Sequence, residues 1–362
     1  MQIFDTLQDL GHEQVVMCSD KITGLRAIIA IHDTSLGPAL GGTRFWNYAN
    51  DEEALTDALR LSRGMTYKAA VSGVNLGGGK AVIIGDAKTM KSEALFRAYG
   101  RMVDSLRGRY ITAEDVNTSV RDMEWIRMET KYVTGVGGAG GSGDPSPVTA
   151  FGVYSGMKAC ARFAWGTDSL NGKRIVVQGA GNVASHLVHS LTKEGAKVFV
   201  TDIFNEKAQE LAAQTGATVI KPEDVFTTEC DIFSPNALGA ILNDSTIPNL
   251  SCSIVCGGAN NQLQEEHKHG AMLKERGIVY GPDYVVNSGG LMNVASEVEG
   301  YDRERVMRQA QGIFDITMNI LVTAKERNIL PVEASNAIAE ERIHKVRHVH
   351  GSYNGSPTIR GV

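Results

Sequence analysis

Short apolar runs and helically spaced apolar stripes alternate along the second half of the chain. Residues 173–177 form such a run, a stripe over 179–194 follows it, and residues 197–201 form the next run. This alternation is typical of strand–helix–strand units with parallel strands. Gly195, after the stripe, is a residue type that commonly ends a helix. Further apolar runs, each a predicted strand, lie at 218–220, 231–233, 254–255 and 278–280. Together they predict an open, mostly parallel sheet with helices on both faces.

The first third of the chain also mixes strand and helix patterns. The predicted strands cover 25–31, 81–84 and 110–112, and helical stripes cover 54–65 and 90–106, the latter as one long helix. Glycine and proline at 36–38 and 41–42 read as breaks after the first strand. Long amphipathic stretches from 303 and from 332 to 344 predict a helical C-terminal part. The fold class predicted for the whole chain is therefore α/β.

A glycine-rich segment at 135–143, GVGGAGGSG, interrupts these patterns. Few of its side chains can pack, so it predicts a domain boundary or hinge. The chain has 362 residues, which is more than a single domain with one hydrophobic core usually contains. The usual size of a domain therefore indicates about two domains.

Composition and charge argue against several classes of protein. The chain is 43% hydrophobic and 21% charged, with a formal net charge of −5 and no basic block, which disfavours a nucleic-acid partner. No apolar run reaches the roughly 18 residues of a membrane helix, and residues 1–21 lack the basic start of a secretory signal. The five cysteines are scattered and the histidines lack a matching acid cluster. We therefore expect a cytoplasmic protein with reduced thiols and no metal site.

The clearest chemical signal is GAGNVA at 179–184, which has the form G-x-G-x-x-A. It follows a predicted strand, opens a predicted helix and precedes a strand that ends at Asp202, which is the context of a dinucleotide-binding fingerprint. The second glycine would let the backbone approach a pyrophosphate. Asp202 would accept hydrogen bonds from ribose hydroxyls and repel a 2′-phosphate, so NAD is predicted rather than NADP. The alternative is a glycine turn that binds nothing.

Two later loops could reach the same cofactor. Residues 234–239 and 257–261 each follow a predicted strand, and ligands of such sheets lie at the carboxyl ends of the strands. These loops supply Asn236, Ala237 and Asn260 as candidate cofactor contacts. Ordinary strand–helix turns are the alternative.

Two lysines and an acid give the first part of the chain a chemical character. Lys68 follows an apolar helix stripe, and Asp115 follows a predicted strand. Lys80 follows the glycines 77–79, which would let the backbone crowd a small ligand. A lone lysine is most often a solvated charge. In a partly desolvated cleft beside another cation, however, a lysine has a lowered pKa and can act as a general base at water or a carbinolamine.

A set of motifs in fixed order is more specific than any of these signals alone. The motifs are GPALGGTR (37–44), MTYK (65–68), NLGGGK (75–80), ITAEDV (111–116), GDPSPVTA (143–150), GAGNVA (179–184), GGANNQL (257–263) and PDYVVNSGGL (282–291). Their order and spacing resemble the glutamate/leucine/phenylalanine/valine dehydrogenase superfamily, and within it most closely the leucine dehydrogenases.

That resemblance implies a reversible, NAD-dependent interconversion of an apolar L-amino acid with its 2-oxo acid and ammonia. It implies that Lys80 activates water or stabilises the carbinolamine and that Asp115 transfers protons. Lys68, with the backbone near Gly41 and Gly42, would hold the substrate carboxylate. The positions implied around NAD and the substrate are Thr149, Gly179, Ala180, Gly181, Asn182, Val183, Asp202 and Asn261.

The resemblance also implies the domain arrangement. A substrate, catalytic and oligomerisation domain would comprise 1–140 plus about 330–362, and a Rossmann-type NAD-binding domain would comprise 145–329. A cleft between the two would close by rotation at the glycine-rich segment. Members of the family are homo-oligomers, commonly octamers among leucine dehydrogenases.

The side chains expected to line the substrate pocket are Leu40, Ala113, Leu291 and Val294. In glutamate-specific relatives a lysine in place of Leu40 pairs with the substrate's side-chain carboxylate, and Val294 replaces a hydroxyl. Glutamate is therefore disfavoured, because its carboxylate would be buried without a partner. Leu291, Asn117 and Ser288 depart from the commoner valine, glycine and alanine.

We therefore predict L-leucine as the substrate, with L-valine and L-isoleucine as secondary substrates. Leu291 keeps phenylalanine or another aromatic amino acid as an alternative. An alternative of another class is a non-catalytic NAD-binding sensor.

Overall fold

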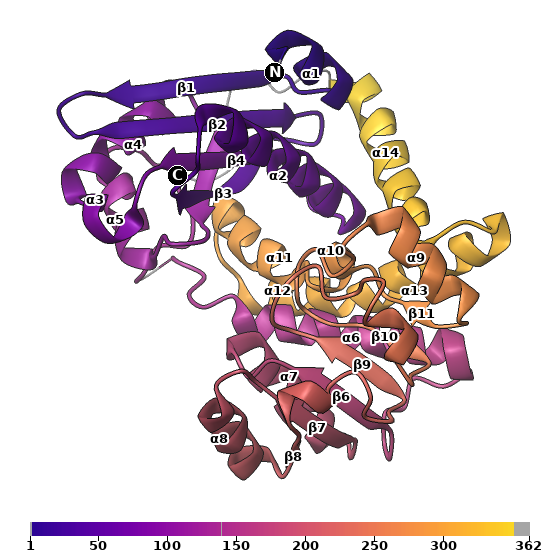
Figure 1. The fold of residues 1–362 in the computed structure, drawn as a ribbon. Helices are drawn as coiled ribbons and strands as arrows, with labels where there is room; N and C mark the ends of the chain where they lie inside the picture. The colour runs from indigo at the N-terminus through magenta and orange to yellow at the C-terminus, as the bar shows by residue number, and fades with distance from the viewer. Residues whose placement is uncertain (1, 139, 351–362) are drawn as a thin grey trace. The chain divides into compact units, whose positions relative to one another are not determined.

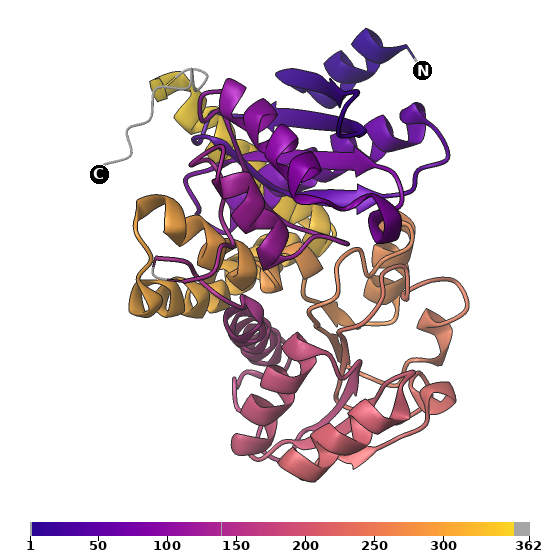
Figure 2. The ribbon, with the colours of Figure 1, turned by 90° about the vertical axis from the view of Figure 1, so that its left-hand side faces the viewer.

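The computed structural model describes residues 2–138 and 140–350 (Figures 1 and 2). The chain divides into two compact units. The first unit comprises Met1–Asp144, Asn293–Asp302 and Ala339–Val362, and the second comprises Pro145–Met292 and Arg303–Ile338. The predicted boundary at 135–143 lies directly before this division, although its residue 139, like 351–362 of the predicted C-terminal part, lies outside the described residues. The N–H groups of Gly135 and Ser142 both donate to the carboxylate of Glu297, the latter at 2.7 Å.

A mixed sheet forms the centre of the first unit. Its strands are β1 (Gln14–Asp20), β2 (Leu25–Asp33), β3 (Ala39–Trp46), β4 (Gly77–Ile84) and β5 (Tyr110–Glu114), in the order β1-β2-β4-β3-β5. β2 is antiparallel to β1 and β4, whereas β3 is parallel to β4 and β5. The predicted strands at 25–31, 81–84 and 110–112 lie inside β2, β4 and β5. β1 and β3 were not predicted.

Helices cover both faces of this sheet because the side chains of its strands alternate between two cores. On one face, α2 (Asp51–Val71) packs Leu59 against Val82. On the other face, α4 (Glu93–Ser105) and α5 (Val120–Arg127) pack with Phe96 against Ile83. A short helix, α1 (Ile3–Leu10), precedes β1.

The single helix predicted over 90–106 is wrong, because the structure divides it into α3 (Ala87–Met90) and α4. Ser92 adopts an extended conformation, with φ −153° and ψ 157°, and its hydroxyl accepts a hydrogen bond from the N–H of Leu95 at 3.2 Å. A serine in this position caps a new helix N-terminus. The apolar stripe continues across the break, which is why spacing alone suggested one helix.

β3 was missed because Gly41 and Gly42 read as breakers. Both are buried within the strand, where the backbone approaches its neighbours closely. A methyl group at Gly41 would lie 1.6 Å from the carbonyl oxygen of Gly79, and one at Gly42 would lie 2.3 Å from that of Glu114. The glycines therefore permit the strand to form between β4 and β5.

The second unit contains the predicted parallel sheet. Its strands are β6 (Arg174–Gln178), β7 (Lys197–Thr201), β8 (Thr218–Val219), β9 (Ile232–Pro235), β10 (Ile254–Val255) and β11 (Val279–Tyr280). They are all parallel, in the order β11-β10-β9-β6-β7-β8. Counted from β6 as the first strand, this is the strand order of a Rossmann fold. The α/β prediction is confirmed.

Helices lie on both faces of the parallel sheet, as predicted. The helices of the second unit are α6 (Ser146–Trp165), α7 (Asn182–Lys193), α8 (Asn205–Thr215), α9 (Glu266–Glu275), α10 (Asp283–Val286), α12 (Arg303–Gln311) and α13 (Ile313–Arg327), with 3-10 turns at Pro222–Asp224 and Ile247–Asn249. The division between the units runs through α11 (Gly289–Ala295) and α14 (Pro331–His350), and the 3-10 turn at Ser296–Glu299 belongs to the first unit. One core packs Leu187 of α7 against Ile175, and the opposite core packs Leu273 of α9 with Val176. Within 2–138 and 140–350, no helix has the length and apolar character needed to cross a membrane.

The helix predicted over 179–194 begins later, at Asn182. Gly179 has a φ of 101° and Gly181 is extended, so the first residues of the motif form a turn before the helix. Gly195 follows the helix with a φ of 90°, the conformation expected for a glycine that ends a helix.

Candidate active site

Three parallel neighbours, β4, β3 and β5, bring distant residues of the first unit together. The register places Arg44 beside Val82, two residues after Lys80, and places Thr43 beside Glu114, one residue before Asp115. Lys80 and Asp115, which the sequence singled out separately, are therefore neighbours in space.

Lys80 and Asp115 form a largely enclosed ion pair. The Lys80 Nζ lies 2.7 Å from Asp115 Oδ1, and the two side chains are 6% and 22% exposed. Asp115 Oδ2 accepts a second bond from Arg44 Nε at 2.9 Å. Both carboxylate oxygens are thus engaged by cations within the first unit.

The surroundings shift the proton affinity of both groups. Burial lowers the pKa of the Lys80 ammonium, and the nearby Arg44 charge lowers it further, while Asp115 opposes this shift. For Asp115, burial would raise the pKa, but the charges and hydrogen bonds of Lys80 and Arg44 outweigh it, so the net pKa is lowered. The pair therefore favours an ionised aspartate beside a lysine that loses its proton more readily than usual.

Arg44 and Asp57 are site residues that the sequence reasoning missed. Arg44 Nη1 donates to Asp57 Oδ2 at 2.8 Å, and the Tyr48 hydroxyl donates to the same oxygen at 2.6 Å. Arg44 stands in the GPALGGTR motif, but without β3 there was no reason to place it beside Asp115. A strand predicted to continue through Gly41 and Gly42 would have placed Arg44 next to the strand that precedes Asp115.

Asn117 explains one of the departures noted in the sequence. It has a φ of 60°, a backbone region that favours glycine and that asparagine tolerates better than most residues. Its side chain donates to the carbonyl of Phe45 at 3.1 Å, which ties the segment after β5 to β3. Asparagine therefore supports the same turn that glycine would.

The glycines before Lys80 do not leave room for a ligand, contrary to the interpretation made from the sequence. A methyl group at Gly77 would lie 2.1 Å from the Asp33 carbonyl oxygen, and one at Gly78 would lie 2.2 Å from Thr66. One at Gly79 would lie 2.7 Å from the ring of Tyr110. These glycines instead let β4 approach its neighbours and α2, which fixes the position of the next residue, Lys80.

The other candidates of the first unit lie around this strand. Lys68 is half-buried in the last turn of α2. The carbonyl of Gly41 accepts a bond from the Tyr110 hydroxyl at 2.6 Å, so its orientation is fixed. Leu40 and Ala113 are buried and apolar, at 1% and 7% exposed.

In the second unit, the turn of the G-x-G motif and the end of β7 are joined directly. Asp202 Oδ2 accepts a hydrogen bond from the N–H of Ala180 at 2.8 Å, and its Oδ1 accepts one from Phe204 at 2.8 Å. A methyl group at Gly179 would lie 2.9 Å from the Asn236 carbonyl oxygen, whereas one at Gly181 would meet no atom within 4 Å. The second glycine therefore borders open space at the N-terminus of α7, beside Asn182 and Val183.

Asparagines connect the loops that follow β9 and β10. Asn236 Oδ1 accepts from the N–H of Gly258 at 2.8 Å, and Asn287 Nδ2 donates to Asn260 Oδ1 at 2.7 Å. Ala237 follows Asn236 and lies near Gly179. The structure thus brings these candidate loops to the first glycine of the motif. Asn287, within the motif PDYVVNSGGL, was not proposed from the sequence.

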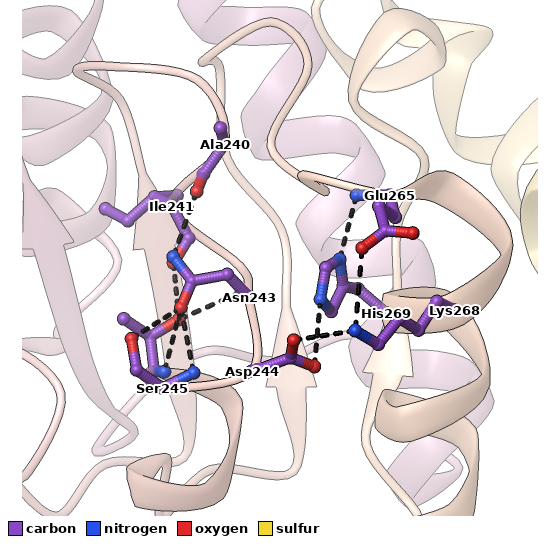
Figure 3. Close-up of polar contacts among 9 residues, drawn as sticks. Ala240, Ile241, Asn243, Asp244, Ser245, Glu265, Lys268 and His269 are labelled. Atoms are coloured by element: carbon purple, nitrogen blue, oxygen red, sulfur yellow. Dashed lines mark hydrogen bonds and ion pairs between the residues drawn. The ribbon is translucent and has the colours of Figure 1, made fainter.

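Polar side chains farther along fix the shape of these loops (Figure 3). Asn243 Nδ2 donates to the carbonyl of Ala240 at 3.1 Å. The N–H of Ala240 donates to the Asn261 carbonyl at 2.6 Å. To the right of Asn243 in Figure 3, the fully buried His269 lies 3.4 Å from a carboxylate oxygen of Asp244. Asn261 has a φ of 52° and an exposed side chain.

Thr149, Leu291 and Val294 complete the set. Thr149 lies in the first turn of α6 and donates to the Pro145 carbonyl at 2.9 Å. A methyl group at Gly290 would lie 2.7 Å from the Thr149 hydroxyl, so the start of α11 packs on that turn. Leu291 is buried and Val294 half-buried in α11. No cluster of three or more residues suited to hold a metal occurs in the described part of the chain.

Known proteins resemble both halves of the chain. The Glu/Leu/Phe/Val dehydrogenase dimerisation domain matches residues 12–132, and the Glutamate/Leucine/Phenylalanine/Valine dehydrogenase domain matches residues 140–203 and 200–351. The chain is 56% identical over 354 residues to a leucine dehydrogenase from Thermoactinomyces intermedius, covering 98% of this chain and 96% of the relative. It is 54% identical over 354 residues to a leucine dehydrogenase from Geobacillus stearothermophilus, covering 98% and 96%.

A solved structure supports the same assignment. The crystal structure of L-tryptophan dehydrogenase from Nostoc punctiforme superposes with a TM-score of 0.86 at 47% identity, covering 95% of this chain and 99% of that one. Sequence and fold therefore agree over nearly the full length, and the chain belongs to the Glu/Leu/Phe/Val dehydrogenase family of amino-acid dehydrogenases.

Proposed function

We propose that this enzyme catalyses the reversible, NAD-dependent oxidative deamination of L-leucine, and of L-valine and L-isoleucine, to the 2-oxo acid and ammonia. The observation that carries the proposal is the buried Lys80–Asp115 pair, in a chain 56% identical to a leucine dehydrogenase.

Lys80 is the proposed general base. Since its pKa is lowered by burial, a larger fraction of the amine is neutral near physiological pH. It can take a proton from the water that adds to C2 of the imine formed when the substrate is oxidised. The resulting ammonium then stabilises the carbinolamine. Asp115, kept ionised by Lys80 and Arg44, exchanges protons with the substrate nitrogen. Lys68 and the backbone of Gly41 and Gly42 hold the substrate carboxylate.

The second unit has features that fit a dinucleotide. Open space at Gly181, directly before α7, permits a pyrophosphate to approach the N–H groups at the helix N-terminus. The Asp202 carboxylate at the end of β7 favours ribose hydroxyls over a 2′-phosphate. Bound nicotinamide would supply the hydride acceptor. The further proposed contacts are Thr149, Gly179, Ala180, Asn182, Val183, Asn236, Ala237 and Asn260.

Dehydrogenases of this family use NAD or NADP, and the choice of NAD rests on Asp202. Its carboxylate already accepts two backbone hydrogen bonds and carries a negative charge toward the end of β7. The 2′-phosphate of NADP would be repelled by that charge.

The proposed substrate pocket is apolar. Leu40 and Ala113 are buried and offer no partner for a second substrate carboxylate, so glutamate would bind with an uncompensated charge. Leu291 and Val294 of α11, with Asn261, are the proposed contacts from the rest of the chain. One methylene contributes only about 1–3 kcal/mol of discrimination, so related aliphatic substrates should also react.

An aromatic substrate is a second candidate, since Leu291 replaces the commoner valine and a tryptophan dehydrogenase shares 48% identity over 344 residues. Initial rates of NAD reduction by the purified protein with L-leucine, L-valine, L-isoleucine, L-phenylalanine, L-tryptophan and L-glutamate, repeated with NADP, separate the possibilities. We expect the highest kcat/KM for L-leucine with NAD. A higher value for an aromatic amino acid would retain the reaction and overturn the substrate.

We also propose that the protein is a homo-oligomer. The first unit contains the region that matches the family's dimerisation domain, residues 12–132. An octamer is the assembly expected from the resemblance to leucine dehydrogenases. Light scattering after size-exclusion chromatography would distinguish it from a dimer, because the chain mass is 38.9 kDa.

A further inference from the structure

Arg44 contacts the proposed proton-transferring acid, and the proposed reaction uses its charge on Asp115 but not the orientation that it imposes. We infer that Arg44, held by Asp57 and Tyr48, is a positioning residue that orients the Asp115 carboxylate and keeps the Lys80–Asp115 pair in its working protonation states. This inference rests on the proposed function for its effect on rate, but the arrangement itself can be tested without an amino-acid substrate.

The geometry of the guanidinium links two carboxylates in a fixed orientation. Arg44 Nε donates to Asp115 at 2.9 Å, and Nη1 donates to Asp57 at 2.8 Å. Because a guanidinium is planar with donors at fixed angles, holding one carboxylate sets the direction toward the other. Asp115 then has one oxygen on Arg44 and the other on Lys80, so rotation of its carboxylate would break both contacts.

The backbone around Arg44 is fixed on both sides. The N–H of Phe45 donates to the Val116 carbonyl at 3.0 Å, and the Thr118 hydroxyl donates to the Thr43 carbonyl at 3.0 Å. The N–H of Asp115 in turn donates to the Thr118 hydroxyl at 2.8 Å. These bonds hold the segment after β5 against β3, so Arg44 and Asp115 cannot separate easily.

Asp57 is fixed independently of Arg44. It lies on α2 and accepts the Tyr48 hydroxyl at 2.6 Å. Arg44, Tyr48 and Asp57 line a cavity of about 780 Å³ in the first unit, together with Trp46 and Val116. The Arg44 and Asp57 side chains are only 24% and 26% exposed, and removing two charges from water offsets much of the free energy of their attraction, so the pair is weak evidence of a role in stability. The arrangement is therefore better explained by what it does to Asp115 and Lys80 than by stability.

The charges of Arg44 and Asp57 act on the pair in opposite directions. The positive charge of Arg44 lowers the pKa of both Lys80 and Asp115, whereas the negative charge of Asp57 raises that of Lys80. Tyr48 and Tyr110 are further titratable groups near the pair, and burial holds both of their pKa values above the usual range. The charged residues Glu52, Glu53 and Arg60 line the same cavity as Arg44 and Asp57. Removing the charge of Arg44 should thus raise the pH at which the pair titrates, and removing that of Asp57 should lower it.

The test compares Arg44→Gln with Asp57→Asn, which remove one charge each and keep polar side chains of similar size. For oxidative deamination, kcat/KM rises as Lys80 loses its proton, so the acidic limb of the pH profile reports the coupled pair. We expect Arg44→Gln to shift this limb to higher pH by about one unit and Asp57→Asn to shift it to lower pH. Shifts in the same direction, or no shift in either variant, would overturn the inference.

Arg44→Lys keeps the charge but lacks the planar fork. We expect its pH limb to stay near that of the unchanged enzyme, while kcat falls about ten- to a hundredfold because the Asp115 carboxylate is no longer oriented. A kcat equal to that of the unchanged enzyme would show that orientation by the fork is unnecessary.

A second measurement separates this inference from the proposed substrate. Competitive acetylation of the full-length protein with acetic anhydride at a series of pH values, read by mass spectrometry of the Lys80 peptide, follows the proton affinity of Lys80 without turnover. The same opposite shifts should appear for Arg44→Gln and Asp57→Asn. If the protein oxidised no amino acid but the labelling shifts were present, the proposed function would fail and the charge arrangement would stand. Absent shifts in a protein that turns over leucine would reject the arrangement alone.

Discussion

Glycines directly precede Lys80 in the first unit and form the G-x-G turn before α7 in the second, and their surroundings differ. Methyl groups at Gly77, Gly78 and Gly79 would lie 2.1, 2.2 and 2.7 Å from protein atoms. At Gly181 a methyl group would meet nothing within 4 Å. The first cluster is filled by the protein itself. In the second, Gly179 is packed, with its methyl position 2.9 Å from the Asn236 carbonyl oxygen, whereas Gly181 borders open space.

The difference shows what a glycine pattern can and cannot indicate. Before Lys80, close packing of β4 with its neighbours fixes the strand and so positions the ammonium beside Asp115. At Gly181 the fold itself gives no reason for the missing side chain, because neither φ nor a neighbour requires glycine. A ligand that approaches the backbone there is the remaining physical reason, as proposed for the pyrophosphate.

Replacing Lys80 should have the largest effect, because it should lower kcat without changing the binding of NADH. In Lys80→Ala, we expect kcat to fall by about 10²–10⁴-fold, because the proposed general base is lost while the second unit is unchanged. The dissociation constant for NADH, measured by fluorescence titration, should stay close to that of the unchanged enzyme. Turnover at the original rate in this variant would refute the role of Lys80.

A methyl group at Gly78 tests the packed cluster. In Gly78→Ala it would lie 2.2 Å from Thr66 and 2.5 Å from the Ser62 carbonyl oxygen, so α2 would have to move away from β4. We expect unfolding free energy to fall by about 1–3 kcal/mol, as for other overpacked cores. Thermal and denaturant unfolding measure the loss.

The matched control lies on the same helix. Gly64 of α2 is exposed, and a methyl group there would meet no atom within 4 Å. Gly64→Ala should therefore raise stability by about 0.5–1 kcal/mol, since alanine favours a helix. Equal stability of Gly78→Ala and the unchanged protein would mean that β4 and α2 can separate without cost, contrary to the packing described.

The contrast between packed glycines and a glycine beside open space also explains which parts of the structure the sequence could predict. Parallel strands between two layers of helices read as apolar runs, so the bounds of β7 and β10 were predicted to the residue, although Lys197 at the start of β7 is exposed. β3 was missed, because a glycine breaks a strand or allows close packing depending on neighbours that are distant in sequence. The run at 77–79 was misinterpreted for the same reason.

The sequence singled out Lys80 and Asp115 as candidate site residues but not the residues that hold them in place. Lys80 and Asp115 stood out by residue type and by resemblance, and the structure places them 2.7 Å apart. Arg44 joins partners 71 and 13 residues away, Asp115 and Asp57, and no local pattern encodes such a pairing. Only the register of β3 between β4 and β5 reveals it.

Replacing Gly181 has the smallest expected effect and tests the open side of the comparison. In Gly181→Ala the backbone already has a φ of −76° that any residue adopts, and the added methyl group meets no protein atom. Stability should thus stay within about 0.5 kcal/mol of the unchanged protein. If the space belongs to the cofactor's pyrophosphate, the methyl group would occupy it, and NADH should bind about tenfold more weakly, a loss of roughly 1.4 kcal/mol.

Gly64→Ala serves again as the control, because it adds the same methyl group to open space far along the chain from the G-x-G motif and should leave NADH binding unchanged. Weakened NADH binding in Gly181→Ala alone, with stability preserved, would show that this glycine is kept for a ligand and not for the fold. NADH binding at the original strength would mean that no ligand approaches Gly181, and the two glycine clusters would then differ only in how tightly the protein packs around them.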